Sequence, residues 1–596
     1  MSQEKKAATN TSKLAILGLI LVILIGTFLR FYHFHDWMHF ELDQSRDARV
    51  VNDALFGGPG ELTLLGMKAG GTSLRLGPGF YYLQYLSGLL FGATPVGMAF
   101  FIPILSVAAI GLFFLLSRRY FSEWLSLGLT SLFSVSTFLV MYGRFAWNPN
   151  PLPFFAILGF YALLRSVEPE AKHAGRWFLI AASAIGFSTH LHFLAFVALP
   201  AITLAFLLIR RPRFTAKVWL LAAGIVMLLY VPVALNEMVT GGVNSKAFIS
   251  AVTNKSSKGE HSMSAKLVKD ISEHGLGFLV VSTGYEGGDF FTFKNGSDGL
   301  VAECDPGCRH GWPYAIGSIL IFTLGVLSLG FLWWKERNRR KADLLLLSGL
   351  WFLIPFVLYL PLSYGIAPRF FLVTAPVPFL FLGFLFETAQ RLLPWKRAVI
   401  FGTVVGIMLL AASNLFFVNR RFDQLAKAPY EAVKSPSDRI LKERVRVPLK
   451  LQEMIVAYLK ERSEENGYPI YMWSEPEYRR ALKYLLERSG VENGVFGMDG
   501  LYEEGIYLTI LRSKSDLDDG TKKYLEKYDL IGTRSFGTLT MIEFRPKPEF
   551  IQARRQVFES GKVKDNPSAL PRYTWSEWWN RHNDTNNDAR DDDVGN

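Results

Sequence analysis

Charged residues and cysteines are both scarce in this chain of 596 residues. Asp, Glu, Lys and Arg make up 19% of it, whereas a soluble globular protein usually carries about 25%. The deficit lies before residue 420, where long apolar runs dominate. The net charge of +12 does not indicate nucleic-acid binding, because Lys and Arg sit in short clusters between apolar runs. The composition therefore predicts an integral membrane protein that contacts the lipid bilayer and binds no nucleic acid.

The two cysteines, Cys304 and Cys308, stand close together in the stretch CDPGC. A zinc site usually takes about four nitrogen or sulfur ligands, so these thiols alone do not predict one. The intervening Asp-Pro-Gly favours a turn, and an oxidising compartment favours pairing of the two sulfurs. We therefore predict a local disulfide and no metal site.

The first apolar run, from about Leu14 to Leu29, follows Lys5, Lys6 and Lys13. No small-residue cleavage site comes after it, so we interpret the run as an uncleaved first span.

Further apolar runs are long enough to cross a bilayer, which takes about 20 residues at roughly 1.5 Å each. The run 177–209 is too long for one crossing and has basic residues on both flanks, so it must turn back near 188–192. About eleven spans result, at 14–31, 93–117, 123–143, 151–167, the two halves of 177–209, 217–238, 312–334, 343–363, 368–390 and 397–418.

The basic clusters between the spans predict the orientation. Arg118 and Arg119, residues 335–341 and residues 391–397 fall on one side, which is cytoplasmic by the positive-inside rule. With an odd number of spans and a cytoplasmic N-terminus, the C-terminal part lies outside. The sequence therefore predicts a multi-pass protein of the cell membrane, with outer loops at 32–92, 144–150 and 239–311.

Two segments of the first outer loop have helical spacing. Residues 46–56 place apolar side chains on one face, and residues 79–92 are rich in aromatic residues but short for a crossing. Both suit helices that lie at the membrane interface.

The C-terminal part alternates helical and strand-like patterns, which is typical of a small α/β domain. The predicted fold class is mainly α, a polytopic transmembrane helical domain with a C-terminal extracytoplasmic α/β domain. The domains are residues 1–420, residues 421–564 and a polar tail at 565–596 that we expect to be disordered.

A charged motif opens the first outer loop. The stretch ELDQSRDA carries Glu41, Asp43, Arg46 and Asp47, and the loop continues to Lys68 and Arg75. A carboxylate that removes a proton and cations that hold a phosphate are the groups that glycosyl transfer from a lipid-phosphate sugar requires.

This layout resembles the membrane-embedded C-type glycosyltransferases, and within them the branch of protein O-mannosyltransferases and lipid A aminoarabinose transferases. The resemblance covers about residues 10–420. The family's Asp-Glu-x-Arg-Tyr-Ala is matched by Asp43-Gln44-Ser45-Arg46-Asp47-Ala48. LGPGFYYLQYLSGLLFG, RFAWNPNPLPFF and PRFFLVTAPVPFLFLG are similar to its Pro-x-x-Tyr-Tyr segment, its second loop and a late span.

The resemblance implies a role for each candidate residue. Asp43 is expected to be the general base, with Glu41 and Asp47 in reserve, and Arg46 its partner. The candidates for binding substrate are Lys68, Arg75, Tyr81, Tyr82, Asn148, Asn150, His190, His192 and Arg369.

Two positions depart from the family pattern. Gln44 replaces a common Glu, which weakens the case for a metal there, and Asn148 or Asn150 replaces a second Asp. An amide positions a substrate but cannot act as a base. The pair His190 and His192 lacks a third ligand, which is more typical of a structural role than of a metal site.

The implied activity is inverting transfer of a sugar from a polyprenyl-phosphate-linked donor to a protein, lipid or polysaccharide hydroxyl. No cofactor is expected, and a divalent metal is left open. A polyprenyl-lipid-binding relative without activity and a multi-span transporter are the alternatives. An en-bloc oligosaccharyltransferase is disfavoured, because neither Trp333-Trp334 nor Trp578-Trp579 is followed by Asp.

Overall fold

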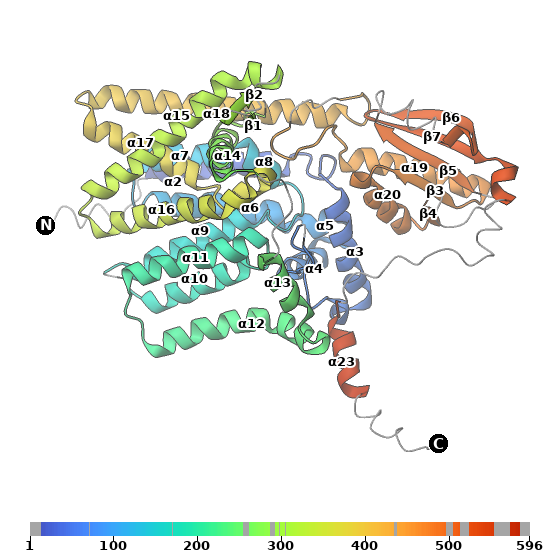
Figure 1. Cartoon of the computed structure of the whole chain (residues 1–596), viewed down its shortest axis with the longest axis horizontal. Helices are drawn as coiled ribbons and strands as arrows, with labels where there is room; N and C mark the ends of the chain where they lie inside the picture. The colour runs from blue at the N-terminus through green and yellow to red at the C-terminus, as the bar shows by residue number, and fades with distance from the viewer. Residues whose placement is uncertain are drawn as a thin grey trace.

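The computed structural model describes residues 13–70, 72–169, 171–253, 261–286, 292–296, 299–303, 306–433, 438–495, 505–512, 524–552 and 572–584. A helical bundle occupies one side of the molecule and a domain built on a mixed sheet the other (Figure 1). The predicted disulfide between Cys304 and Cys308 falls outside the described residues.

The helical part runs to residue 427. It comprises α2 (Lys13–Phe31), α3 (Leu42–Gly57), η1 (Pro59–Glu61), α4 (Gly79–Phe91), α5 (Pro95–Ala99), α6 (Phe101–Ser117), α7 (Glu123–Val135), α8 (Thr137–Tyr142), α9 (Leu152–Val167), α10 (Ala174–Ser188), α11 (Phe193–Arg210), α12 (Ala216–Thr240), α13 (Val243–Thr253), α14 (Met263–Thr283), β1 (Thr292–Gly296), β2 (Gly299–Glu303), α15 (Pro306–Lys335), α16 (Arg339–Tyr359), η2 (Leu360–Gly365), η3 (Pro368–Leu372), α17 (Val377–Leu392) and α18 (Lys396–Lys427).

Within the described residues, seven helices are long and apolar enough to cross a membrane. In α12 only Ala222, Pro232 and Asn236 are buried, so its other apolar side chains face outward, as a lipid-facing helix requires. The chain is therefore a multi-pass membrane protein. The remaining predicted spans are helical but shorter, and the predicted turn between α10 and α11 is present.

Two predicted spans are interrupted. The run 123–143 breaks between α7 and α8 at Ser136, whose hydroxyl accepts a hydrogen bond from the Leu139 amide and donates one to the carbonyl of Val281 at 2.7 Å. The run 368–390 begins as the 3₁₀ helix η3, and α17 starts only after Pro376. Proline removes an amide donor, which favours such a break.

The predicted loop 239–311 holds more structure than a simple connection. It contains α13 and α14, and α14 packs against α8, α15 and α18. In Figure 1 α14 is seen nearly end-on while α9 and α11 run across the picture, so it lies crosswise to them. Its charged residues Lys266, Lys269, Asp270 and Glu273 explain why its hydropathy stays below that of a span.

The C-terminal domain has a five-stranded sheet of order β4-β3-β5-β7-β6. Strand β3 is parallel to β4 and β5, whereas β7 is antiparallel to β5 and β6. The elements are α19 (Leu449–Asn466), β3 (Ile470–Ser474), α20 (Pro476–Arg488), β4 (Asn493–Val495), β5 (Ile506–Arg512), β6 (Tyr528–Phe536) and β7 (Leu539–Pro546). The α/β character predicted from the alternating patterns is confirmed.

One part of the tail predicted to be disordered is ordered. Residues 575–584 form helix α23 (Trp575–Asp584), which packs against η1 and α12. Trp575 and Trp578 are half-buried there, and this burial supplies the apolar contact that a polar tail lacks.

The three predicted outer loops meet at one end of the bundle. His39 pairs with Pro448 of the C-terminal part, Trp147 contacts Asp43, and Asn244 holds Arg75. This convergence places the charged motif of the first loop beside segments from far along the chain.

Candidate active site

The motif of the first loop forms the first turns of α3. Glu41 is its N-cap, and the backbone amide of Glu41 donates to the Gln44 side chain at 3.0 Å in a capping box. Because residues three and four apart share a helix face, Asp43, Arg46 and Asp47 lie together.

Arg46 bridges the two aspartates. Its Nη1 donates to Asp43 Oδ1 at 2.9 Å, and its Nε donates to Asp47 Oδ1 at 2.8 Å. The Asp43 side chain is 36% exposed, whereas that of Asp47 is fully buried. Of these two aspartates, only Asp43 thus presents a carboxylate that a substrate can reach.

Tyr81 of α4 completes the buried side of this group. Its hydroxyl donates to Asp47 Oδ1 at 3.2 Å. Burial raises the pKa of Asp47 to about 6, although the adjacent Arg46 charge opposes the shift. Burial and the Asp47 charge raise the pKa of Tyr81, so its hydroxyl keeps its proton.

Trp147 approaches Asp43 from the second outer loop. Its indole Nε1 donates to Asp43 Oδ2 at 3.1 Å, and Arg369 lies over its ring with Cζ 5.0 Å from the centroid. Sequence reasoning did not select Trp147, although it stands inside the RFAWNPN segment. It links the predicted Arg369 to the Asp43 site.

Arg75 lies within electrostatic range of Tyr81. Asn244 accepts a hydrogen bond from the Arg75 amide at 2.8 Å and donates to its carbonyl at 3.0 Å. Arg75 Nη1 donates to the Gly66 carbonyl at 3.2 Å, while its buried Nε has no partner. Burial, together with the charges of Arg572 and Arg46, lowers the pKa of Arg75.

Several other candidate residues form hydrogen bonds with backbone groups of the protein. Asn148 Nδ2 donates to the Leu191 carbonyl at 2.5 Å, and Asn150 Nδ2 donates to that of Phe145 at 2.8 Å. The Tyr82 hydroxyl donates to the Thr63 carbonyl at 3.2 Å. Lys68 is exposed, and only its backbone pairs with that of Arg75.

The two predicted histidines, His190 and His192, have different neighbours and do not form one site. His190 Nδ1 accepts a hydrogen bond from the Gly79 amide at 3.3 Å, and a Cβ on Gly77 would come within 2.4 Å of that ring nitrogen. His190 thus fixes the glycine turn before α4. His192 caps α11 and adjoins Phe370. Burial and the Arg369 charge lower the pKa of His192 to about 3, so it is neutral.

One group of three potential metal ligands comes together among the described residues, namely His39, Glu41 and Glu443. His39 Nδ1 lies 2.6 Å from Glu443 Oε1, and His39 Nε2 lies 3.7 Å from Glu41 Oε2. Glu443 also accepts hydrogen bonds from Arg421 at 2.8 Å and Arg446 at 2.6 Å. A cation here would compete with both arginines.

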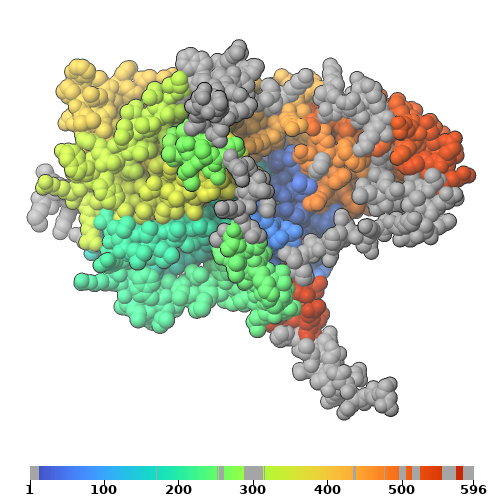
Figure 2. Space-filling view, viewed as in Figure 1, coloured from blue at the N-terminus to red at the C-terminus, as the bar shows by residue number. Residues whose placement is uncertain are grey.

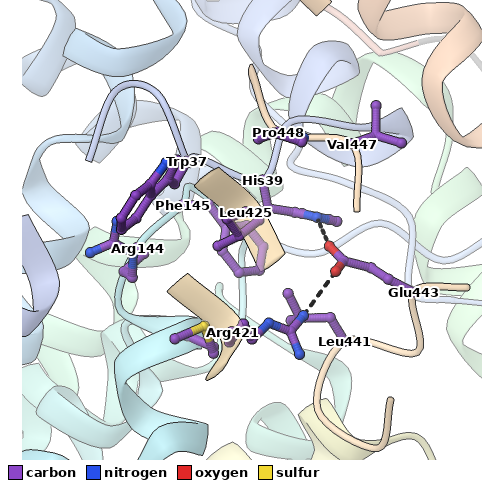
Figure 3. A pocket seen from close by; sticks show the side chains of 11 residues that line it. Trp37, His39, Arg144, Phe145, Arg421, Leu425, Leu441, Glu443, Val447 and Pro448 are labelled. Atoms are coloured by element: carbon purple, nitrogen blue, oxygen red, sulfur yellow. Dashed lines mark hydrogen bonds and ion pairs between the residues drawn. The ribbon is translucent and has the colours of Figure 1, made fainter. Parts of the chain in front are cut away.

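A buried ionic network therefore continues from His39, and a pocket adjoins it (Figure 3). Burial alone raises the pKa of Glu443, but Arg421, the hydrogen bond with His39 and Arg446 lower it to about 2. We call this set the junction network, and its members are His39, Glu286, Arg421, Asp438, Glu443 and Arg446.

Comparison with known proteins identifies similar sequences and folds. Residues 76–235 match the sequence model of a family described as dolichyl-phosphate-mannose-protein mannosyltransferase. The solved structure of ArnT from Cupriavidus metallidurans in the apo state matches with a TM-score of 0.50 and 11% identity, over 89% of this chain and 97% of that one. The structure of ArnT from the same organism bound to undecaprenyl phosphate matches with a TM-score of 0.47 and 12% identity, over the same shares. No curated protein sequence matches the chain. The resemblance inferred from the motifs is confirmed.

Proposed function

We propose that this chain, which carries a mannosyltransferase-family segment on the fold of the C-type membrane glycosyltransferases, transfers a sugar from a polyprenyl-monophosphate donor to an acceptor hydroxyl. One observation carries the proposal. The Asp43 carboxylate is accessible and accepts hydrogen bonds from Arg46 and Trp147, and Arg46 in turn lies within electrostatic range of Arg75.

The proposed reaction is a single inverting displacement. The acceptor oxygen forms a bond to the anomeric carbon while the bond from that carbon to the phosphate oxygen breaks. The acceptor proton passes to Asp43, and the electron pair of the broken bond stays on the polyprenyl phosphate. Its added negative charge is balanced by Arg75, or by Arg369 on the Trp147 side.

Arg46, Asp47 and Tyr81 then act by positioning. Arg46 donates to both aspartates, so the buried Asp47 and Tyr81 fix the guanidinium, which in turn orients Asp43. The hydrogen bonds from Arg46 and Trp147 end on different oxygens of Asp43, so together they hold its carboxylate in one orientation.

No organic cofactor enters the proposed step, and the arginines supply the counter-charge for the leaving phosphate. His39, Glu41 and Glu443 are the residues that could hold a divalent cation. Chelation with EDTA tests that role, because turnover carried by the arginines alone should not change when metal is removed.

We further propose that the site faces away from the cytoplasm, as the distribution of Lys and Arg indicates. Support comes from contacts of the first predicted outer loop with the other two, since Trp147 of the second loop binds Asp43 and Asn244 of the third loop binds the Arg75 backbone. A reporter fused after residue 420 should be active only outside the cytoplasm, and a cytoplasmic signal would contradict this orientation.

The function is tested by incubating the purified protein in nanodiscs with a panel of polyprenyl-monophosphate sugars. Release of the polyprenyl monophosphate from one donor, in the presence of acceptor lipids, peptides or polysaccharide, is the expected result. Binding of a donor without its consumption across the panel would instead favour a lipid-binding protein without activity. This second candidate function, lipid binding without activity, is motivated by Asn148 or Asn150, one of which stands where the family commonly places a second Asp.

A further inference from the structure

The segment 572–584, here called the C-terminal strap, docks on the first outer loop rather than on the C-terminal sheet domain. Thr574 forms an antiparallel bridge with Thr63. The Leu64 amide donates to the Tyr573 carbonyl at 2.8 Å, and the Trp575 amide donates to the Leu62 carbonyl at 3.1 Å. In Figure 1 the red α23 lies below α3 and α4, apart from the sheet.

Side chains reinforce this docking. Trp575 Nε1 donates to the Tyr82 hydroxyl at 2.9 Å, and the Ser576 hydroxyl donates to Glu61 Oε1 at 2.7 Å. The Tyr573 amide donates to Asn236 at the end of α12, at 3.3 Å. Figure 2 shows the red surface of α23 beside the green surface of the neighbouring α12–α13 corner.

That same corner holds Arg75. Asn244 of α13 grips the Arg75 backbone, and Glu237 of α12 in turn accepts a hydrogen bond from the Asn244 amide at 3.0 Å. The strap and Arg75 are thus fixed by one structural element, which sets where the first residue of the strap, Arg572, can lie.

Arg572 lies beside Tyr81. Its Cζ is 6.0 Å from the centroid of the Tyr81 ring, whose hydroxyl contacts Asp47. Its charge acts on Arg75, as does that of Arg46. The exposed carboxylate of Asp53 lies within electrostatic range of Arg572 but makes no ion pair with it.

The charges around Tyr81 are not balanced. Arg46 is paired with Asp43 and Asp47, whereas neither Arg75 nor Arg572 forms an ion pair with another described residue. Like charges gathered in a partly buried place are unfavourable unless an anion offsets them. The unpartnered, buried Nε of Arg75 also indicates a missing acceptor.

We infer that Arg572 is a third cation of the site that binds the donor phosphate, and that the C-terminal strap delivers it. The inference rests on the proposed function and extends it, because it assigns a binding role to a segment outside the helical bundle and outside the sheet domain. The strap pairs with residues 61–64 of the same loop that carries Arg75, so Arg572 and Arg75 are placed to bind one anion.

Binding of undecaprenyl monophosphate to the protein in nanodiscs tests the inference, with wild type, Arg572→Ala, Arg572→Lys, Arg75→Ala and Arg581→Ala in parallel. Arg572→Ala should weaken binding by about 3–10-fold, and Arg572→Lys should restore most of it, because the charge is kept. Arg581→Ala is the matched control, since Arg581 lies on the same strap, exposed, and stacks on Tyr573.

The outcomes separate the inference from the proposed function. If the wild type binds undecaprenyl monophosphate no more tightly than undecaprenol, the proposed function is contradicted. Wild-type binding that falls in Arg75→Ala but not in Arg572→Ala would overturn only the role of Arg572. Equal losses in Arg572→Ala, Arg572→Lys and Arg581→Ala would also overturn it, since they indicate a loosened strap rather than a lost charge.

Docking of the strap is tested without activity. Thr63 and Thr574 form the non-hydrogen-bonded pair of their bridge, which brings two Cα atoms close enough for a disulfide. In a Cys304→Ser, Cys308→Ser background, Thr63→Cys with Thr574→Cys should cross-link under mild oxidation and keep phosphate binding. A pair that stays reduced would contradict the docked strap.

Discussion

Two charge clusters share the end of the helical bundle, and they differ in balance. The junction network joins Arg421, Arg446 and protonated His39 to three carboxylates, all largely buried. In the Asp43 site Arg46 is paired with two aspartates, whereas Arg75 and Arg572 form no ion pair with another described residue, and the Asp43 side chain is 36% exposed.

This difference separates a structural role from a binding role. Burying charges costs free energy that pairing must offset, so a closed and balanced network is what a joint between domains requires. A cluster that is open and has excess cations lacks an anion, which a substrate phosphate can supply. The short stretch from His39 to Asp47 contributes to both clusters, because His39 belongs to the junction network and Asp43, Arg46 and Asp47 belong to the Asp43 site.

The largest expected effect on stability comes from breaking the junction network. Arg421→Met keeps the apolar stem but leaves buried carboxylates unpaired, which should cost about 3–5 kcal/mol. Thermal unfolding of the detergent-solubilised protein measures it. Arg420→Met, at an exposed position of the same helix, is the control and should change stability by less than about 0.5 kcal/mol. Equal melting temperatures for Arg421→Met and Arg420→Met would contradict the structural role of the junction network.

A smaller, pH-dependent effect is expected at His39. Burial lowers its pKa, but the charges of Glu41 and Glu443 outweigh burial and raise the pKa to about 9. A raised histidine pKa stabilises the fold fully below about pH 6.5, and this contribution is lost as the pH rises through about 9.

Wild type should therefore exceed His39→Gln by on the order of 2–3 kcal/mol at pH 6, and by much less at pH 9.5. The exposed His35→Gln is the control, because its side chain is 53% exposed and its ion pairs are screened. A stability gap between wild type and His39→Gln that grows with pH would contradict the sign of the shift.

The smallest expected effect concerns Arg75 in the Asp43 site. Arg75→Ala should raise the KM for the donor by about 10–100-fold, with a smaller change in kcat, because it removes a charged contact to the phosphate. Stability should change little, since Arg75 pairs with no described carboxylate. Steady-state kinetics with Arg49→Ala, which removes a surface cation paired with Glu487, provide the control. A change confined to kcat would argue against phosphate binding.

The part of the site formed by one helix could be predicted, because it depends only on the spacing of residues along that helix. Asp43, Arg46 and Asp47 are three and four residues apart, so the face they share follows from the sequence alone. The α/β elements of the C-terminal domain followed from period-two and period-3.6 patterns in the same way.

The rest depends on contacts between distant segments. Nothing near Trp147 indicates that its indole reaches Asp43, and the junction network joins residues from His39 to Arg446. The sequence did not predict helix α23, because the acidic residues at the end of the chain dominate the local composition. The signal that could have found it is the set of three tryptophans in WSEWWNRH, which is unusual for a disordered tail.

The central claim is that Asp43 removes the acceptor proton. The most direct test is single-turnover transfer by Asp43→Asn, on the donor that wild type consumes, with melting temperature and polyprenyl-phosphate binding measured on the same sample. The amide keeps the size of the side chain but cannot take the proton, so the rate should fall by about 10²–10⁴. Folding and binding should stay close to wild type, because the carboxylate is 36% exposed. Near-wild-type transfer by Asp43→Asn would contradict the account.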